Sequence, residues 1–240
     1  MKSFIHKILS SKTFVYWLNP WERIYSKFVP NDLSKPYEGF PEIVSFLRSA
    51  QAESVLDIAM GHGRHTLALI ELGFKVSGFD YSPSAVKRAQ EIIRKKHSAY
   101  NTTVFKQGNM FYKYPFEDES FDAAIAIQAI YHGFKNDMQK AINQAARVLK
   151  DGGLFIFTVS KDTTRSTVIK ENLHKKKNHI LKLLPNTYLP LSGRETGLIH
   201  FYPDKKMLRE MLKDNFDHVI ITDDEVNAYF VVKCNKKRKR

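Results

Sequence analysis

The stretch Val55–Glu91, VLDIAMGHGRHTLALIELGFKVSGFDYSPSAVKRAQE, decides the fold of this chain. It contains a short apolar run, a loop with two glycines, a helical segment, a second apolar run and a new helix start. A buried strand followed by a helix and another strand is typical of a right-handed parallel βαβ unit covered on both faces. Ser82 and Pro83 form the helix start, since a capping hydroxyl precedes a proline in the first turn. The stretch therefore predicts an α/β domain.

The alternation continues along the chain. Apolar runs predict strands at 103–109, 121–128 and 154–160, and a helix that Asn136 or Asp137 caps and that Gly152 and Gly153 end. That helix has one apolar face, made of Met138, Ala141, Ile142, Ala145, Val148 and Leu149. A helix over about 204–214 follows, and then two strands close enough in sequence to form a hairpin.

The flanking segments are organised around this core within a single domain. Proline-broken helical segments predict an N-terminal helical cap, and a basic, histidine-rich stretch without the strand–helix rhythm predicts a lid. The predicted boundaries are 1–45 for the cap, 46–159 for the cofactor-binding core, 160–202 for the lid or insertion, 203–235 for the C-terminal helix and strand hairpin, and 236–240 for a basic tail.

Composition excludes several classes of protein. With 43 % hydrophobic and 26 % charged residues in 240, the chain is not mainly disordered and fits one elaborated domain. It has no apolar run long enough for a membrane span and no signal-peptide core, and its single cysteine, Cys234, cannot form an internal disulfide. We therefore expect a soluble cytoplasmic protein without a membrane partner.

The net charge of +13 points to an anionic partner only weakly. Part of the excess lies in two runs, 175–177 and 236–240. The second run is interpreted as a frayed, solvated tail, with a nuclear-import signal or a phosphate-binding patch as alternatives. No aromatic residues are interleaved with either run, which makes stacking on nucleic-acid bases less favoured.

The glycine loop and two acids predict a site for an adenosine-containing ligand. Gly61 and Gly63 allow a tight turn, and Asp80 ends the second strand 23 residues after Asp57, where an acid can hold ribose hydroxyls. Thr66 stands where a dinucleotide fingerprint has its third glycine. A carboxylate at Asp57 would repel a pyrophosphate by a few kcal/mol at about 4–6 Å and an effective dielectric constant near 20. A ligand carrying an ammonium and a sulfonium reverses that sign.

These residues resemble the class I (Rossmann-like) S-adenosylmethionine-dependent methyltransferases. The stretch 55–91 is similar to that family's glycine motif and second-strand acid, and 107–110, 121–132 and 149–160 are similar to its later motifs. The resemblance runs from about Ser54 to Ser160. It implies a doubly wound, seven-stranded, mostly parallel sheet with an antiparallel last strand and helices on both faces. It also implies S-adenosyl-L-methionine (SAM) as the cofactor.

By the same resemblance, several residues line the cofactor site. Asp57 would orient the methionyl ammonium directly or through water, Asp80 would bind the ribose, and Tyr81 would pack on the adenine. The full expected set is Asp57, Ala59, Gly61, Gly63, Asp80, Tyr81, Asn109, Met110 and Gln128. Ala59 replaces the usual first glycine, which is tolerable if its φ is negative, and Asn109 replaces the commoner aspartate. Each of these residues also has a purely structural alternative, as a cap or in packing.

Acceptor residues are expected outside the core motifs. His132, Glu195 and His200 are the candidate catalytic residues, with Tyr131 and Tyr25 as further candidates for acceptor contact. A general base is needed only if the acceptor must lose a proton. No metal site is predicted, because His174 and His179 are five residues apart and no cysteine lies near them.

The acceptor class stays open between alternatives. The sequence Gln128-Ala129-Ile130-Tyr131 stands where related DNA amino-methyltransferases carry a box with two prolines, so DNA is not expected. The compact size and the aromatic cap favour methyl transfer to an N, O or S atom of a small molecule. The alternatives are an RNA methyltransferase and a non-catalytic module that binds SAM or a partner.

Overall fold

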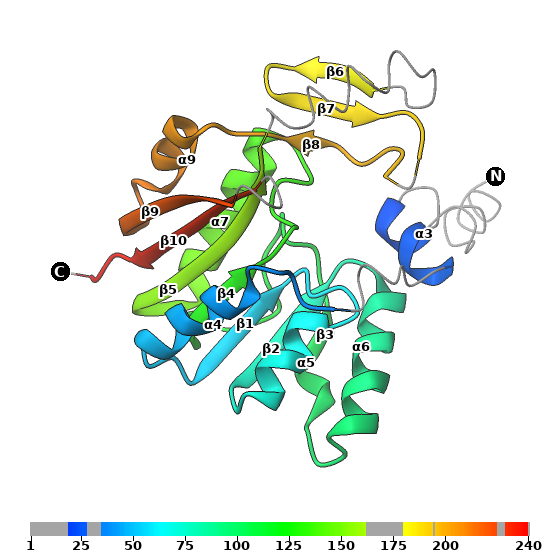
Figure 1. Ribbon diagram of the computed structural model, residues 1–240, viewed down its shortest axis with the longest axis vertical. Coiled ribbons are helices and arrows are strands. Elements are labelled where there is room, and N and C mark those ends of the chain that lie inside the picture. Colours follow the sequence, from blue (N-terminus) through cyan, green and yellow to red (C-terminus); the bar gives the residue numbers. More distant parts are fainter. Residues whose placement is uncertain (1–18, 28–34, 162–179, 194, 225–228, 240) are drawn as a thin grey trace, which may run out of the picture.

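A seven-stranded sheet forms the centre of the molecule (Figure 1). The structure is a computed structural model, and it describes residues 19–27, 35–161, 180–193, 195–224 and 229–239. The strand order is β3-β2-β1-β4-β5-β10-β9. The strands are β1 (Ser54–Ile58), β2 (Lys75–Asp80), β3 (Phe105–Gln107), β4 (Phe121–Ala126), β5 (Leu149–Ser160), β9 (Phe216–Asp224) and β10 (Tyr229–Lys236). Because β1 pairs with both β2 and β4, the order of the strands reverses at β1.

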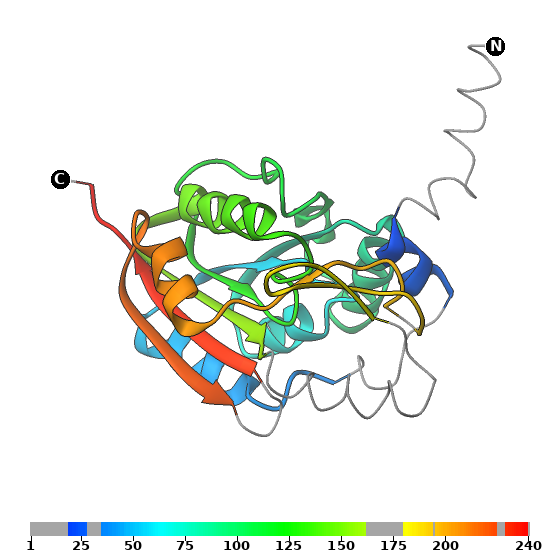
Figure 2. The same ribbon diagram turned by 90° about the horizontal axis from the view of Figure 1, so that it is seen from above.

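Helices cover both faces of this sheet. They are α4 (Phe40–Ser49), α5 (Arg64–Glu71), α6 (Pro83–Lys96), α7 (Lys135–Val148) and α9 (Lys205–Leu212). Successive strand side chains point to opposite faces: Val55 packs in the cluster under α4, α5 and α6, whereas Leu56 packs in the cluster under α7 and α9. Figure 2 shows the green α7 and the blue α4 on opposite sides of the sheet.

The predicted architecture is confirmed. The strands β1 to β5 are parallel, and β10 runs antiparallel to both β5 and β9. Ser82 caps α6, because its hydroxyl accepts a hydrogen bond from the Ala85 amide at 3.1 Å. The six apolar residues predicted for one face of the helix at 135–148 are all fully buried.

Three local predictions were wrong. Helix α7 begins at Lys135, so Asp137 is not its cap; its carboxylate instead accepts from the Phe134 amide at 3.2 Å. The glycine pair 152–153 lies within β5, because that strand already begins at Leu149, which pairs with Phe121 before the register shifts. The third strand is shorter than expected, since a 3-10 turn occupies Thr102–Val104.

The segment predicted as a lid contains a small sheet that the sequence did not indicate. Strands β6 (Ile180–Leu184), β7 (Thr187–Pro190) and β8 (His200–Phe201) pair antiparallel. Residues 162–179, with His174, His179 and the first lysine run, lie outside the described residues. Of the predicted cap, the structure describes helix α3 (Pro20–Lys27) and the residues from 35 on.

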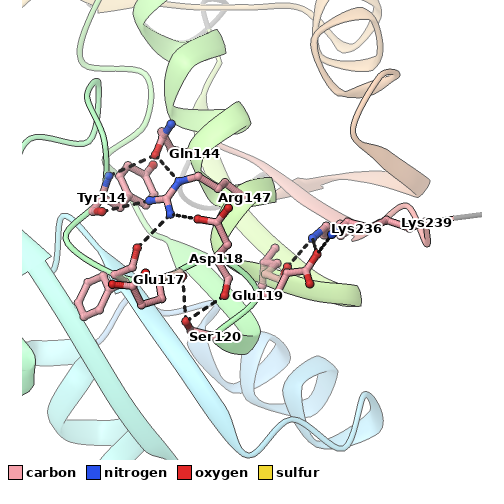
Figure 3. Close-up of polar contacts among 11 residues, drawn as sticks. Tyr114, Glu117, Asp118, Glu119, Ser120, Gln144, Arg147, Lys236 and Lys239 are labelled. Carbon is pink, nitrogen blue, oxygen red and sulfur yellow. Dashed lines mark hydrogen bonds and ion pairs between the residues drawn. The ribbon is translucent and has the colours of Figure 1, made fainter.

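The interpretation of the C-terminal basic run as a frayed tail was wrong for residues 236–239. The Lys236 ammonium donates to the Leu149 carbonyl at 2.7 Å and lies 3.2 Å from a Glu119 carboxylate oxygen. The Lys239 backbone amide donates to Asp151 at 3.1 Å, and its ammonium pairs with Glu119 (Figure 3). Nearby, the Arg147 guanidinium holds the loop between β3 and β4 by donating to the Tyr114 carbonyl at 3.1 Å. Acidic residues of the domain therefore neutralise part of this basic run.

Among the residues that the structure describes, no helix has both the length and the apolar character needed to cross a membrane.

Candidate cofactor and acceptor site

A cavity of about 840 Å³ opens at the carboxyl ends of β1, β2, β3 and β4. In open α/β sheets, ligands bind where the strand order reverses, which here is between β1 and β4. The volume lies within the usual range of about 300–1,000 Å³ for small-ligand sites. Helix α3 and the turn at 195–199 also contribute lining residues, so the cavity lies between the sheet and these added elements.

The loop after β1 has an unusual backbone. Gly61 and Gly63 have positive φ values of +56° and +77°, and Ala59 has a φ of +55°. The condition under which alanine is tolerable at position 59, a negative φ, is therefore not met, and a residue with a Cβ in this region costs about 1–2 kcal/mol. At Gly61 a Cβ would lie 2.7 Å from the Tyr25 hydroxyl oxygen, so the glycine is needed for space as well as for conformation. Gly63 packs against Ala89 of α6 and does not line the cavity.

Asp80 holds the loop and lines the cavity at the same time. One carboxylate oxygen accepts from the Gly61 amide at 2.9 Å, and the other accepts from the Ser82 amide at 2.8 Å. Burial raises the pKa of Asp80 to about 6, although these two hydrogen bonds lower it, and Glu22 raises it further. A carboxylate has about four acceptor positions, and the Tyr81 backbone amide also contributes a hydrogen bond, so about one position remains for a ligand hydroxyl.

Asp57 is buried beneath the loop. Its carboxylate accepts from the Thr66 hydroxyl at 2.6 Å, and it is not among the residues that line the cavity. Burial raises the pKa of Asp57 to about 7, while the Thr66 hydrogen bond and Arg64 lower it. At neutral pH the group is thus only partly ionised, so its repulsion of a pyrophosphate is weaker than the sequence argument assumed. Thr66 stands where a dinucleotide fingerprint has its third glycine, and its hydroxyl here forms the hydrogen bond to the Asp57 carboxyl group.

The other predicted cofactor residues lie around the same cavity. Tyr81, Asn109, Met110 and Gln128 all line it. Tyr81 is 38 % exposed, and the Asn109 side-chain oxygen accepts from the Phe111 amide at 2.9 Å, which leaves its amino group free to turn toward a ligand. Gln128 has a φ of +56°, and its backbone amide donates to the Thr158 hydroxyl oxygen at 2.7 Å. Backbone strain of this kind is often found at functional sites.

Helix α3 is fastened over the site by polar side chains. Its residue Glu22 accepts from the Ser84 hydroxyl at 2.5 Å and from the Ser84 amide at 3.2 Å, and it also bonds the Ser82 hydroxyl. Asn19 donates to the Tyr81 carbonyl at 3.3 Å, and Arg23 donates to the Thr196 carbonyl. The helix thereby links the start of α6 to the turn of the insertion (Figure 1).

The three candidate catalytic residues lie together, and two of them, His132 and Glu195, line the cavity. The nearest Glu195 carboxylate oxygen is 3.4 Å from Nε2 of His200, and the rings of His132 and His200 meet edge to face at 4.7 Å. Tyr131 and Tyr25 also line the cavity. The rings of Trp21 and His132 are 4.8 Å apart. The sequence predicted these residues singly, without their contacts.

Sequence reasoning missed two further cavity residues. Arg64, in the first turn of α5, donates to the Gln128 side-chain oxygen and to the Lys35 carbonyl. A cation directly after a predicted glycine loop was the available signal. His62 is buried, and its Nε2 has no hydrogen-bond partner among the described residues. Burial, Arg88 and Arg64 lower the pKa of His62 to about 4, so the ring is neutral at physiological pH.

The fold is Rossmann-like, with a cavity at the point where the strand order reverses, and known proteins similar to this chain are methyltransferases. A family profile described as "Methyltransferase domain" matches residues 55–153. A tRNA (carboxymethyluridine(34)-5-O)-methyltransferase of Arabidopsis thaliana is 31 % identical over 143 residues, 57 % of this chain and 31 % of that protein. A glycine/sarcosine N-methyltransferase of Parasynechococcus marenigrum is 33 % identical over 115 residues, 47 % of this chain and 40 % of that protein.

Solved structures share the fold. A SAM-dependent methyltransferase of Clostridium acetobutylicum superposes with a TM-score of 0.66 at 14 % identity, covering 92 % of this chain and 99 % of that one. Magnesium protoporphyrin IX methyltransferase of Synechocystis, with bound S-adenosylhomocysteine, gives 0.62 at 18 % identity, covering 99 % and 100 %. Residues 55–153 thus match a methyltransferase domain, and the chain has the fold of the class I SAM-dependent methyltransferases. It matches only about a third to two fifths of the length of the two curated relatives above.

The cavity fits the cofactor of this family, SAM. Asp80 lines the cavity and keeps an acceptor position for a ribose hydroxyl. Gly61 and His62 both line the cavity, and the buried Nε2 of His62 offers a polar atom there. Neutral His62 adds no positive charge to a region that must accept a sulfonium.

Proposed function

We propose that this chain transfers the methyl group of SAM to an N, O or S atom of a small-molecule acceptor. The observation that carries the proposal is the roofed cavity of about 840 Å³, which continues from Asp80 to the cluster of His132 and Glu195. When bound, SAM supplies an electrophilic methyl group on a positively charged sulfur. A cavity bounded by Trp21, Tyr25 and Tyr131 suits a compact acceptor with apolar surface.

In this proposal the chain's own residues mainly orient the reactants and exclude water. Asp80 binds the ribose, Tyr81 packs on the adenine, and Asn109 and Met110 face its edge. Ala59 and Gly61 line the methionyl and ribose path, with Gln128 near its end. Asp57 lies beneath the loop, outside the cavity lining, and supports the loop through its hydrogen bond with the Thr66 hydroxyl. Alignment of this kind contributes about 7–11 kcal/mol to lowering a barrier.

His132 is placed to accept a proton where the acceptor has one to lose. Its Nδ1 lies 3.0 Å from the Ala129 carbonyl oxygen, so the proton sits on Nδ1 and the lone pair on Nε2. Tyr131 and Trp21 pack against the ring and hold its orientation. His200 and Glu195 complete the proposed acceptor end.

Calorimetry with SAM, followed by transfer of a labelled methyl group, tests the proposal. We expect binding in the micromolar range and labelling of a small molecule from a fractionated metabolite extract. Labelling of tRNA instead would favour the RNA alternative, which the Arabidopsis relative and the net charge of +13 support. SAM binding without transfer to any acceptor would favour a non-catalytic module, and absence of SAM binding would refute the proposal.

A further inference from the structure

The cluster of His132, Glu195 and His200 has the composition and convergence of a metal site. Each residue offers one ligand atom, and these atoms all lie within 4.8 Å of one another. His132 and His200 are 7 % and 0 % exposed, while the Glu195 side chain is 30 % exposed. Two histidines with one carboxylate are a common donor set for zinc and for ferrous iron, with coordination positions left open.

Backbone hydrogen bonds hold together the two segments that carry His132 and His200. The Phe201 amide donates to the Tyr131 carbonyl at 2.9 Å, so the residue after His200 is bonded to the residue before His132. His200 itself is paired with Tyr188 in the small sheet. These bonds fix the loop after β4 to strand β8, although the two segments are far apart in the sequence.

The side chains are also oriented as ligands. Because Nδ1 of His132 faces the Ala129 carbonyl, Nε2 is the nitrogen left with a lone pair. A backbone carbonyl bonded to the far ring nitrogen is the usual outer support of a metal-bound histidine. Glu195 is held by a tight turn, in which the Leu198 amide donates to its carbonyl at 3.0 Å.

We propose that His132, Glu195 and His200 bind a divalent transition-metal ion of the zinc class. Around a tetrahedral ion with bonds of about 2.0–2.1 Å, ligand atoms stand about 3.4 Å apart. Glu195 and His200 already have a separation of 3.4 Å, and the widest pair must close by about 1.4 Å from the 4.8 Å limit. Small rotations of the three ligand side chains would supply that movement. The spacing argument from the sequence missed this site because its ligands come from separate segments.

The ion would face the acceptor end of the cavity. His132 and Glu195 both line the cavity, whereas His200 lies behind them. Open coordination positions would therefore point toward the acceptor. This part of the inference rests on the proposed function: the ion would select an acceptor with an oxygen, nitrogen or sulfur donor. A bound metal lowers the pKa of such a donor and holds its lone pair. It would thereby replace His132 in the role of base proposed above, because the Nε2 lone pair of His132 would bind the ion and not a proton.

Metal titration of the whole chain tests this inference without any measurement of activity. The protein is stripped with a chelator, dialysed against Zn²⁺ and analysed by elemental mass spectrometry, and Co²⁺ is used as a visible probe of coordination. We expect about one ion per chain and a four- or five-coordinate cobalt spectrum. Glu195→Gln, His132→Gln and His200→Gln should each weaken binding at least about tenfold, since each removes one ligand.

The controls make the outcome decisive. His97→Gln changes a histidine at the end of α6, outside the cluster, and should bind metal like the parent. Glu195→Gln is the key variant if the fully buried His200 cannot be replaced without unfolding. Absence of metal binding, or binding that Glu195→Gln and His132→Gln leave unchanged, would overturn the proposal. SAM calorimetry on the metal-free chain separates this failure from a failure of the proposed function.

Discussion

The ionisation of Asp80 should set the affinity for SAM across the pH range of about 5 to 8. Its carboxylate is the group with a spare acceptor position at the end of β2, and burial raises its pKa to about 6. If the ribose binds the ionised form, the affinity is greatest well above pH 6 and falls as the group takes up a proton. At about pH 5 only about a tenth of the groups are ionised, so we expect Kd to be about tenfold weaker than on the plateau.

Asp80→Asn isolates this effect. The amide keeps one oxygen for a backbone donor but loses the charge-assisted contact, which is worth about 1.5–3 kcal/mol, or about 10- to 150-fold in Kd. Its affinity should also lose the pH dependence centred near 6. Asp57 titrates near pH 7. The comparison is therefore made in an Asp57→Asn background, by calorimetry at several pH values.

The matched control is Asp217→Asn, an exposed carboxyl group near the start of β9. It should bind SAM as the parent does. A parent affinity that is flat between about pH 5 and 8, or an Asp80→Asn protein that binds as tightly as the parent at pH 8, would contradict the assignment of Asp80 to the ribose.

Three further results are expected. Asp57→Asn should remove a pH dependence of stability. Because Asp57 keeps its proton up to about pH 7 in the folded state, the free energy of unfolding of the parent falls by up to about 4 kcal/mol between about pH 4 and 7. Urea denaturation of both proteins at several pH values measures this difference. Glu22→Gln should move the pH midpoint of SAM binding downward, since the Glu22 charge raises the pKa of Asp80. Gly61→Ala should destabilise by about 1–3 kcal/mol, and adding Tyr25→Phe should recover part of that loss by removing the clashing hydroxyl.

Each of these results has a clear opposite. Equal slopes of stability against pH in the parent and Asp57→Asn would mean that the buried carboxyl group is ionised at a normal pKa. An unchanged midpoint in Glu22→Gln would place its charge too far from Asp80 to matter. Strictly additive effects of Gly61→Ala and Tyr25→Phe would show that backbone conformation alone demands the glycine.

Local sequence was sufficient for much of the α/β core. The strand Lys75–Asp80 and the start of α6 were predicted at the residues where the structure has them, because apolar runs and a serine–proline start act over a few residues. The start of α7 was missed because Phe134 carries no capping side chain to mark it. The small sheet of β6, β7 and β8 was missed because its strands have only two to five residues, too few to show a clear alternation of apolar and polar side chains.

The sequence by itself determined the order of strands and helices in the α/β core, the glycine loop, and the acid that ends the second strand. Only the tertiary structure decided the charge state and surroundings of these groups. It buried Asp57 away from the cavity, put Ala59 into a left-handed conformation, and brought His132, Glu195 and His200 together. The physical reason is range: strand and helix patterns depend on neighbours within a few residues, whereas desolvation and side-chain convergence depend on segments that meet only when the chain folds.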